Sequence, residues 1–168
     1  MASIWGRFSF WHGICNGVGI IGNPAIFMRR AVFMTRTYNI FISHSWGYGD
    51  DYETLTGFLD GHPYFSWRNY SVPKDDPIHN ARSRAALRAA LQEKIRHASC
   101  VIVPAGVYCT YSDWIEEEID IALEMGKPII GVRLRGAERV SSIVRENAID
   151  IVGWTSDSVV DAIRYYSI

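Results

Sequence analysis

The chain has 168 residues, of which 17 are Lys or Arg, 18 are Asp or Glu, and 48% are hydrophobic. This length favours a single domain, and the apolar share is too large for a disordered chain. The formal net charge of -1 argues against a general nucleic-acid binder, which needs a basic surface, so we expect no nucleic-acid partner.

The first 33 residues carry three arginines and no acidic residue. Their apolar stretch is interrupted by polar residues and a proline, which argues against a signal peptide and against a membrane-spanning helix. The interruptions are His12, Asn16, Asn23 and Pro24. We therefore expect residues 1–35 to be an extension outside the fold, residues 36–168 to form the domain, and no association with a membrane. Met34 could serve as an alternative start.

Cysteine and histidine spacing bears on the redox compartment and on metals. Cys15, Cys100 and Cys109 form no C-x-x-C pair and leave one cysteine over, which favours a reducing compartment and hence the cytoplasm. The five histidines share no metal-ligand spacing with cysteines or acids, so we expect no metal site.

From residue 38 onward, short apolar or alternating runs take turns with stretches of helical periodicity. The predicted strands are 38–43, 65–72, 100–103, 129–132 and 149–154. The predicted helices are 52–59, the stretch that contains Leu87, Leu91 and Ile95, then 112–125, 140–147 and 157–166. This alternation indicates an α/β fold: a flavodoxin-like, doubly wound, five-stranded parallel sheet with helices on both faces.

Sheets of this kind bind ligands beyond the carboxyl ends of their strands. The segments at these ends are 43–46, 70–76 and 105–111. Their polar and aromatic residues are therefore the first candidates for a binding site.

Glu118 has an unusual position in the predicted helix 112–125. When each residue is placed about 100° further around the helix axis, Glu118 falls inside an apolar arc, one turn after Trp114 and one turn before Ala122. The arc consists of Trp114, Ile115, Ile119, Ile121, Ala122 and Met125. A carboxylate at such a position is costly to bury unless it has a partner or faces a cleft.

The pattern alone leaves two interpretations of Glu118 open. It is either a structural carboxylate that caps a loop or pairs with an arginine, or a functional carboxylate in a cleft. A place near the helix start would add about 0.3–1 kcal/mol of dipole stabilisation. Several neighbouring charges are expected on solvated helix faces instead. These are Glu116, Glu117, Asp120 and Glu124, and in the preceding helix Arg84, Arg88, Lys94 and Arg96.

With these residues in view, the chain resembles the TIR-domain family. Residues 41–45, Phe-Ile-Ser-His-Ser, match its first-strand motif, and residues 112–119 match its S-x-W-x-x-x-E-[LI] helix motif. Residues 126–130 look like the strand that follows. More narrowly, residues 65–73 resemble the bacterial TIR-like branch that includes the Thoeris B proteins of antiphage defence.

The resemblance implies an activity. Enzymatic TIR domains cleave the bond between nicotinamide and ribose in NAD+, and the glutamate at the position of Glu118 is their catalytic residue. An NAD+ nucleosidase or cyclase is therefore implied, with a cyclic ADP-ribose-type or conjugate product that a separate effector protein senses. NAD+ is the expected substrate, and no further cofactor is expected. The resemblance also implies a homo-oligomer formed through TIR–TIR contacts.

Eight further residues are expected to bind the substrate. They are Ser43, His44, Ser45, Trp46, Ser71, Lys74, Tyr108 and Trp114. The first four end the first strand and should border the nucleotide, and Trp46 or Trp114 could stack on one of its rings. Lys74 could meet a phosphate, and Tyr108 could line the opening of the site.

Two other functions stay open on the sequence. One is a catalytically silent TIR module that works only by assembling with other TIR domains. The other is a different N-glycosidic enzyme on a similar sheet, resembling nucleoside deoxyribosyltransferases, that would turn over free nucleosides.

Overall fold

A computed structural model of the chain describes residues 36–43, 50–72, 83–106 and 113–168. The chain divides into two units, residues 1–33 and 34–168, and all described residues belong to the second unit. The division into an extension of residues 1–35 and a domain of residues 36–168 stays a prediction.

Five parallel strands in the described part of the chain form one sheet. They are β1 (Thr37–Ile42), β2 (Ser66–Asn69), β3 (Cys100–Pro104), β4 (Ile129–Val132) and β5 (Asp150–Val152). Their order across the sheet is β2-β1-β3-β4-β5, and every neighbouring pair is parallel. This is the flavodoxin-like order, so the predicted doubly wound fold is confirmed.

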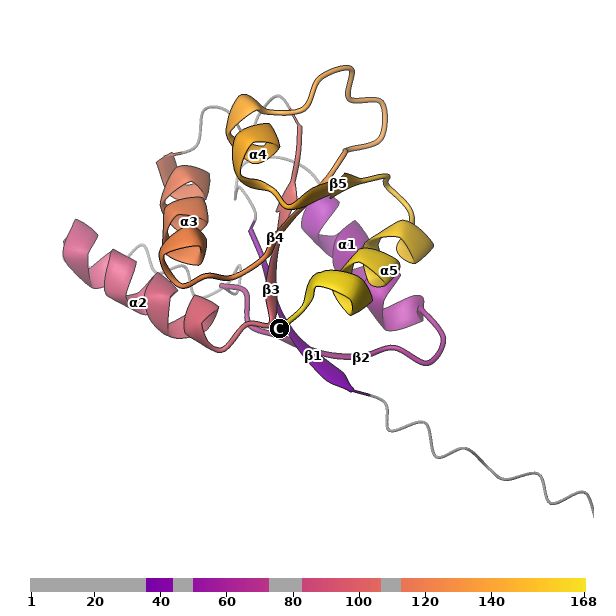
Figure 1. The fold of residues 1–168 in the computed structure, drawn as a ribbon, viewed down its shortest axis with the longest axis horizontal. Helices are drawn as coiled ribbons and strands as arrows, with labels where there is room; N and C mark the ends of the chain where they lie inside the picture. The colour runs from indigo at the N-terminus through magenta and orange to yellow at the C-terminus, as the bar shows by residue number, and fades with distance from the viewer. Residues whose placement is uncertain (1–35, 44–49, 73–82, 107–112) are drawn as a thin grey trace, which may run out of the picture. The chain divides into compact units, whose positions relative to one another are not determined.

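The described helices cover both faces of the sheet (Figure 1). α1 (Asp51–Gly61) and α5 (Ser156–Tyr166) pack on one face. The other face is covered by α2 (Arg84–Arg96), α3 (Asp113–Glu124) and α4 (Ser142–Asn147). No helix among the described residues has the length and the apolar character that a membrane span requires.

Local signals set several of the helix ends. Ser83 Oγ accepts a hydrogen bond of 3.2 Å from Ala86 N at the start of α2, and Thr155 Oγ1 accepts one of 3.3 Å from Ser158 N at the start of α5. Such N-cap contacts satisfy amide groups that have no partner inside the helix. After α3, Gly126 adopts a φ of 63°, a left-handed conformation that favours glycine.

Alternation along the strands divides the core into two layers. Phe41 and Val101 pack in the layer under α2, α3 and α4, whereas Ile40 and Ile42 pack in the layer under α1 and α5. Successive side chains of a strand point to opposite faces. The residue after Ile42, which is Ser43, therefore follows Phe41 onto the face that carries α3.

Gly131 in β4 allows α4 to lie close to the sheet. A Cβ atom at this position would be 2.8 Å from Val144 Cγ1 and 3.1 Å from Ile151 Cγ1. We expect Gly131→Ala to lower the free energy of unfolding by about 1–3 kcal/mol, because the extra methyl group overpacks this layer. Denaturant unfolding measures the change.

The control for this substitution is Gly57→Ala. Gly57 is exposed inside α1, and a Cβ atom there meets no other atom within 4 Å. Alanine should stabilise the helix there by roughly 0.5–1 kcal/mol. If Gly131→Ala changed the free energy of unfolding as little as Gly57→Ala does, the tight packing of α4 on Gly131 would be contradicted.

Candidate active site

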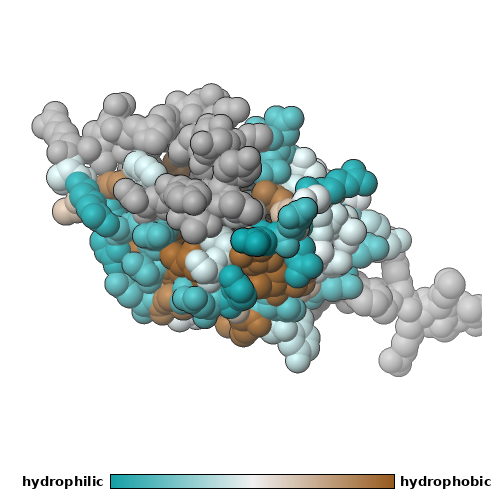
Figure 2. Space-filling model, turned by 90° about the horizontal axis from the view of Figure 1, so that it is seen from above, coloured by the Kyte–Doolittle hydropathy of each residue, from teal (hydrophilic) through white to brown (hydrophobic). Residues whose placement is uncertain are grey.

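The switch point of the sheet lies between β1 and β3. The helix that follows β1, which is α1, packs on one face of the sheet, and the helix that follows β3, which is α3, packs on the other (Figure 1). Doubly wound sheets bind ligands at such a switch point, beyond the carboxyl ends of the strands. Figure 2 views the molecule from the top of Figure 1, toward the carboxyl ends of the strands, and shows apolar residues between polar ones on the described surface.

Glu118 lies on the inner side of α3 and is only 6% exposed. The acidic residues Glu116, Asp120 and Glu124 of the same helix are exposed. The predicted inward orientation of Glu118 is thus confirmed. Among the described residues, no basic side chain pairs with Glu118, and its Oε2 atom has no hydrogen-bond partner. The interpretation of Glu118 as half of an ion pair has no support in this part of the chain.

Burial dominates the ionisation of Glu118. The loss of hydration raises the pKa of its carboxyl group to about 8, and the nearby Ser43 hydroxyl offsets part of this rise. The group is therefore mostly a neutral acid at pH 7. A carboxyl whose pKa is shifted this far, at the ligand-binding edge of a sheet, is a functional-site candidate on physical grounds.

Glu118 lies near the start of its helix, as expected from the sequence. α3 begins at Asp113, which places Glu118 in the second turn of the helix. The helix dipole acts mainly within the first turn. The expected dipole stabilisation of this carboxylate stays a prediction.

Ser43 meets Glu118 from the end of β1. It is fully buried, and its backbone N donates a hydrogen bond of 2.8 Å to Ile102 O of β3. Its Oγ lies near enough to favour the charged form of Glu118, although neither this Oγ nor Glu118 Oε2 makes a hydrogen bond of regular geometry with a described residue. The structure thus brings together two of the predicted site residues from different elements.

Ser71 makes a backbone contact that the sequence did not predict. Its Oγ accepts a hydrogen bond of 2.8 Å from Ile42 N, and its own N donates one of 2.9 Å to Asn69 Oδ1. β2 ends at Asn69, so the hydroxyl oxygen replaces a strand carbonyl as the acceptor for β1. Ser71 therefore secures the end of β1 directly before Ser43. Its expected role in substrate binding stays a prediction.

Trp114 lines a small cavity with residues of α2 and α3. The cavity has a volume of about 220 Å³, and its described lining residues are Arg84, Leu87, Trp114 and Glu117. Glu118 is not among them. The expected stacking of Trp114 on a ring of the substrate stays a prediction.

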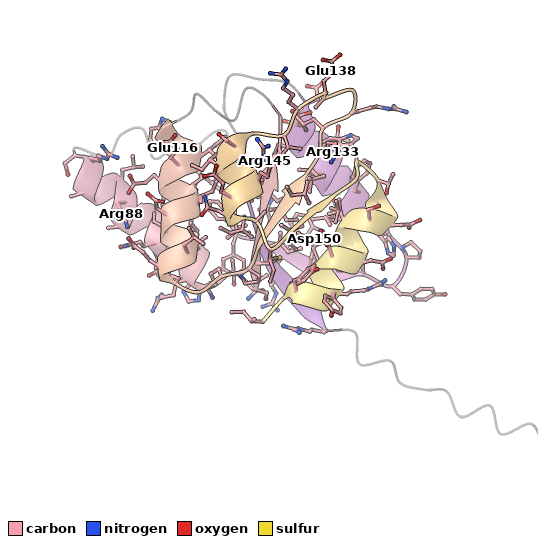
Figure 3. All side chains as sticks on the ribbon, turned by 45° about the horizontal axis from the view of Figure 1, so that its top comes forward. Arg88, Glu116, Arg133, Glu138, Arg145 and Asp150 are labelled. Atoms are coloured by element: carbon pink, nitrogen blue, oxygen red, sulfur yellow. The ribbon has the colours of Figure 1, made fainter. Side chains whose placement is uncertain are left out.

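The expectation of a solvated Glu117 is wrong. Glu117 is buried against α2, where Arg84 Nη2 donates to its Oε2 at 3.0 Å and Arg88 Nη1 donates to its Oε1. Hydrogen bonds from Arg88 and then from Arg84 hold the pKa of Glu117 below its usual range. Arg88 also donates to Glu124 Oε1 at 2.6 Å, and Figure 3 shows Arg88 on α2 beside α3. The Arg88 side chain is only 30% exposed, so its expected place on a solvated helix face is wrong as well, whereas the Arg84 side chain remains 84% exposed.

A weak signal for this contact exists in the sequence. On the helical projection Glu117 lies about 40° from Ile121, at the border of the apolar arc. Arg84 and Arg88 stand four residues apart, which places them on one face of their helix. A helical projection treats each helix separately, so it does not predict that the Glu117 side of α3 packs against the Arg84 and Arg88 face of α2.

Arg88→Met is expected to destabilise the protein, because it leaves the buried Glu117 carboxylate with fewer partners. Thermal unfolding measures the loss as a lower Tm. The matched control is Arg96→Met, since Arg96 pairs with Glu93 on the exposed surface, where ion pairs contribute little. A Tm decrease for Arg88→Met no larger than that of the control would contradict a stabilising contact between α2 and α3.

Five of the predicted site residues lie outside the described residues. They are His44, Ser45, Trp46, Lys74 and Tyr108. Their roles stay predictions. Within the described ranges, no group of three His, Cys, Asp or Glu side chains is placed to hold a metal ion.

A family model described as the TIR-like domain of the Thoeris protein ThsB matches residues 41–139, which is more than half of the chain. The chain belongs to this family. The resemblance inferred from the motifs is thereby confirmed. In this ThsB-type domain, the matched region contains Ser43, Ser71 and Glu118.

Two solved structures show a distant likeness to the ThsB-type domain. The CMP N-glycosidase BcmB from Clostridium botulinum is 19% identical, with a TM-score of 0.48, and the match covers 76% of this chain and 99% of that protein. The apo form of the glycosyltransferase GlyE from Streptococcus pneumoniae TIGR4 is 14% identical, with a TM-score of 0.39, over 79% of this chain and 34% of that one. A likeness at this level carries no conclusion about function. A search of curated proteins found no match.

Proposed function

We propose that this ThsB-type domain cleaves the nicotinamide–ribose bond of NAD+ and that Glu118 is its catalytic carboxylate. The observation that supports the proposal is a buried carboxyl group without an ionic partner in the described structure, next to the Ser43 hydroxyl at the switch point of the sheet. Membership of the TIR-like family adds to it, because enzymatic TIR domains act on NAD+.

The reaction makes little demand on acid catalysis. The nicotinamide ring of NAD+ is cationic, so it leaves as neutral nicotinamide when its bond to ribose C1′ breaks and the electron pair stays on nitrogen. Positive charge then develops on the ribose as an oxocarbenium ion, as in glycoside hydrolysis. A fixed carboxylate in a site shielded from water stabilises that charge far better than solvent does.

The raised pKa of Glu118 is compatible with this role. Before substrate binds, the carboxyl is mostly neutral, so no lone charge is buried at pH 7. A bound cationic nicotinamide ring would favour the carboxylate, and the Glu118 proton would pass to solvent. Substrate binding would thus charge the catalytic group at the stage at which the charge is needed.

The acceptor that attacks ribose C1′ determines the product. Water gives ADP-ribose and a proton, whereas a hydroxyl or an adenine nitrogen of the same molecule gives a cyclic ADP-ribose isomer and a proton. We propose the signal-making mode, in which the product activates a separate effector in antiphage defence, in line with the Thoeris family. A homo-oligomer that completes the site is part of this proposal.

Incubation with NAD+ followed by chromatography and mass spectrometry tests the proposal. We expect release of nicotinamide and formation of one ADP-ribose-derived product, with a rate that increases as the protein assembles at higher concentration. An assembled sample that releases no nicotinamide would favour a silent scaffold. Turnover of free nucleosides without turnover of NAD+ would favour an enzyme of the nucleoside deoxyribosyltransferase type.

A further inference from the structure

Two buried polar atoms without regular partners meet at the switch point, one on Ser43 and one on Glu118. We infer that Ser43 is a positioning residue, whose hydroxyl donates a hydrogen bond to the Glu118 carboxylate in the reactive state and holds it in one orientation. This inference rests on the proposed function. The expected role of Ser43 in bordering the nucleotide stays a prediction.

Hydrogen bonds to β3 and to the segment after β2 hold the backbone at Ser43 in place. Ser43 N donates to Ile102 O at 2.8 Å, and the amide of the preceding residue, Ile42, donates to Ser71 Oγ at 2.8 Å. The side chain follows Phe41 onto the α3 face and is fully buried. A hydroxyl on such a fixed backbone is a donor in a defined place, which a positioning contact requires.

An unsatisfied buried polar group is unusual, because the group loses its hydrogen bonds to water and gains none in return. Here Ser43 Oγ and Glu118 Oε2 are both in this state, although they are neighbours. A hydroxyl beside a neutral acid gains less than one beside a carboxylate, since hydrogen bonds to charged groups are about twice as strong. The contact is therefore expected to tighten when Glu118 loses its proton.

Among the described charged groups around Glu118, none takes the place of Ser43 as a partner for the Glu118 carboxylate. On α2, Arg84 and Arg88 donate to Glu117. On α4, Arg145 and Glu146 are exposed. The described residues of β1, β3 and β4 carry no charge, and the remaining acids of α3 are repulsive toward a carboxylate or already paired. The Ser43 hydroxyl is the group in this set that favours the charged form of Glu118.

The decisive variant is Ser43→Ala. Loss of the hydroxyl should lower kcat for NAD+ cleavage about tenfold or more, since the lost hydrogen bond involves a charged group. It should also move the rising limb of the kcat/KM profile to higher pH, because the carboxylate loses the donor that favours it. Folding should be preserved, since a hydroxyl without a regular partner contributes little to stability.

Two variants serve as controls for Ser43→Ala. Ser43→Thr retains the hydroxyl and should restore the wild-type pH profile. Ser141→Ala removes another buried hydroxyl without a described partner, at the N-cap of α4, and should leave both kcat and the profile unchanged. A merely structural loss would lower activity without moving the pH at which the rate rises.

A second measurement does not need activity. The carboxyl carbon of Glu118 can be titrated by NMR in glutamate-labelled protein without substrate, with the signal assigned by its absence in Glu118→Gln. An upward shift of the Glu118 pKa in Ser43→Ala supports the inference, and an unchanged titration overturns it. If the wild-type protein does not cleave NAD+ at all, the proposed function fails, whereas this titration still decides whether Ser43 acts on Glu118. If NAD+ is cleaved and Ser43→Ala keeps the wild-type rate and profile, only the inference about Ser43 is wrong.

Discussion

Glutamine in place of Glu118 is expected to lower kcat for NAD+ cleavage by about 100- to 1000-fold, the usual range for the loss of one electrostatic contact to a transition state. The amide has nearly the same size as the carboxyl group and still forms hydrogen bonds. It carries no negative charge, so it cannot stabilise the oxocarbenium character of the ribose. Initial rates of nicotinamide release measure the effect.

Glu116→Gln is the matched control, because it makes the same chemical change two residues away on the exposed side of α3 (Figure 3). Its kcat should equal that of the wild type. Circular dichroism and unfolding curves establish that both variants are folded. If Glu118→Gln retained the wild-type rate, Glu118 would not be the catalytic group and the proposed mechanism would be wrong.

The free energy of unfolding of the wild type is expected to fall by about 2–3 kcal/mol between pH 5 and pH 7, relative to Glu118→Gln. The ordinary pKa of a glutamate is 4.5, and burial raises the pKa of Glu118 to about 8 in the folded state. Between these values the folded protein binds one proton more than the unfolded chain, so a rise in pH favours unfolding. The contribution is fully present below about pH 4.5 and is lost as the pH rises through 8.

Urea unfolding at pH 5, 6, 7 and 8 measures this dependence. The difference between the two proteins removes the contribution of other carboxyl groups, such as Glu117, whose lowered pKa acts in the opposite direction at more acidic pH. Parallel curves for wild type and Glu118→Gln would contradict a buried, neutral Glu118.

The two results together distinguish a functional carboxyl from a structural one. A structural carboxylate that pairs with an arginine should destabilise the protein when it is replaced at neutral pH. The opposite is expected for Glu118. Its replacement should remove activity, and it should also remove the decrease in the free energy of unfolding that the buried Glu118 carboxyl causes near pH 7. A group that reduces stability and is needed for the reaction is typical of an active site.

The hydrophobic pattern of the sequence determined the fold. The continuous apolar runs at 100–103 and 129–132 became β3 and β4, since a strand covered on both faces needs apolar residues in succession. The helical stretches between them imply parallel, right-handed connections, and these led to the observed strand order. The same reasoning placed Glu118 on the buried side of its helix, because periodicity gives the angle of each residue about the helix axis.

Only the tertiary structure decided which groups meet. Glu117 stands at the border of the apolar arc, and its burial depends on α2, whose arginines lie beside it only after folding. β2 is shorter than the predicted run 65–72, because Ser71 uses its side chain where a strand would use its backbone. The meeting of Ser43 and Glu118 likewise joins β1 to α3 on one face of the sheet. Periodicity describes one element at a time, whereas these contacts depend on the distance between elements that are far apart in the chain.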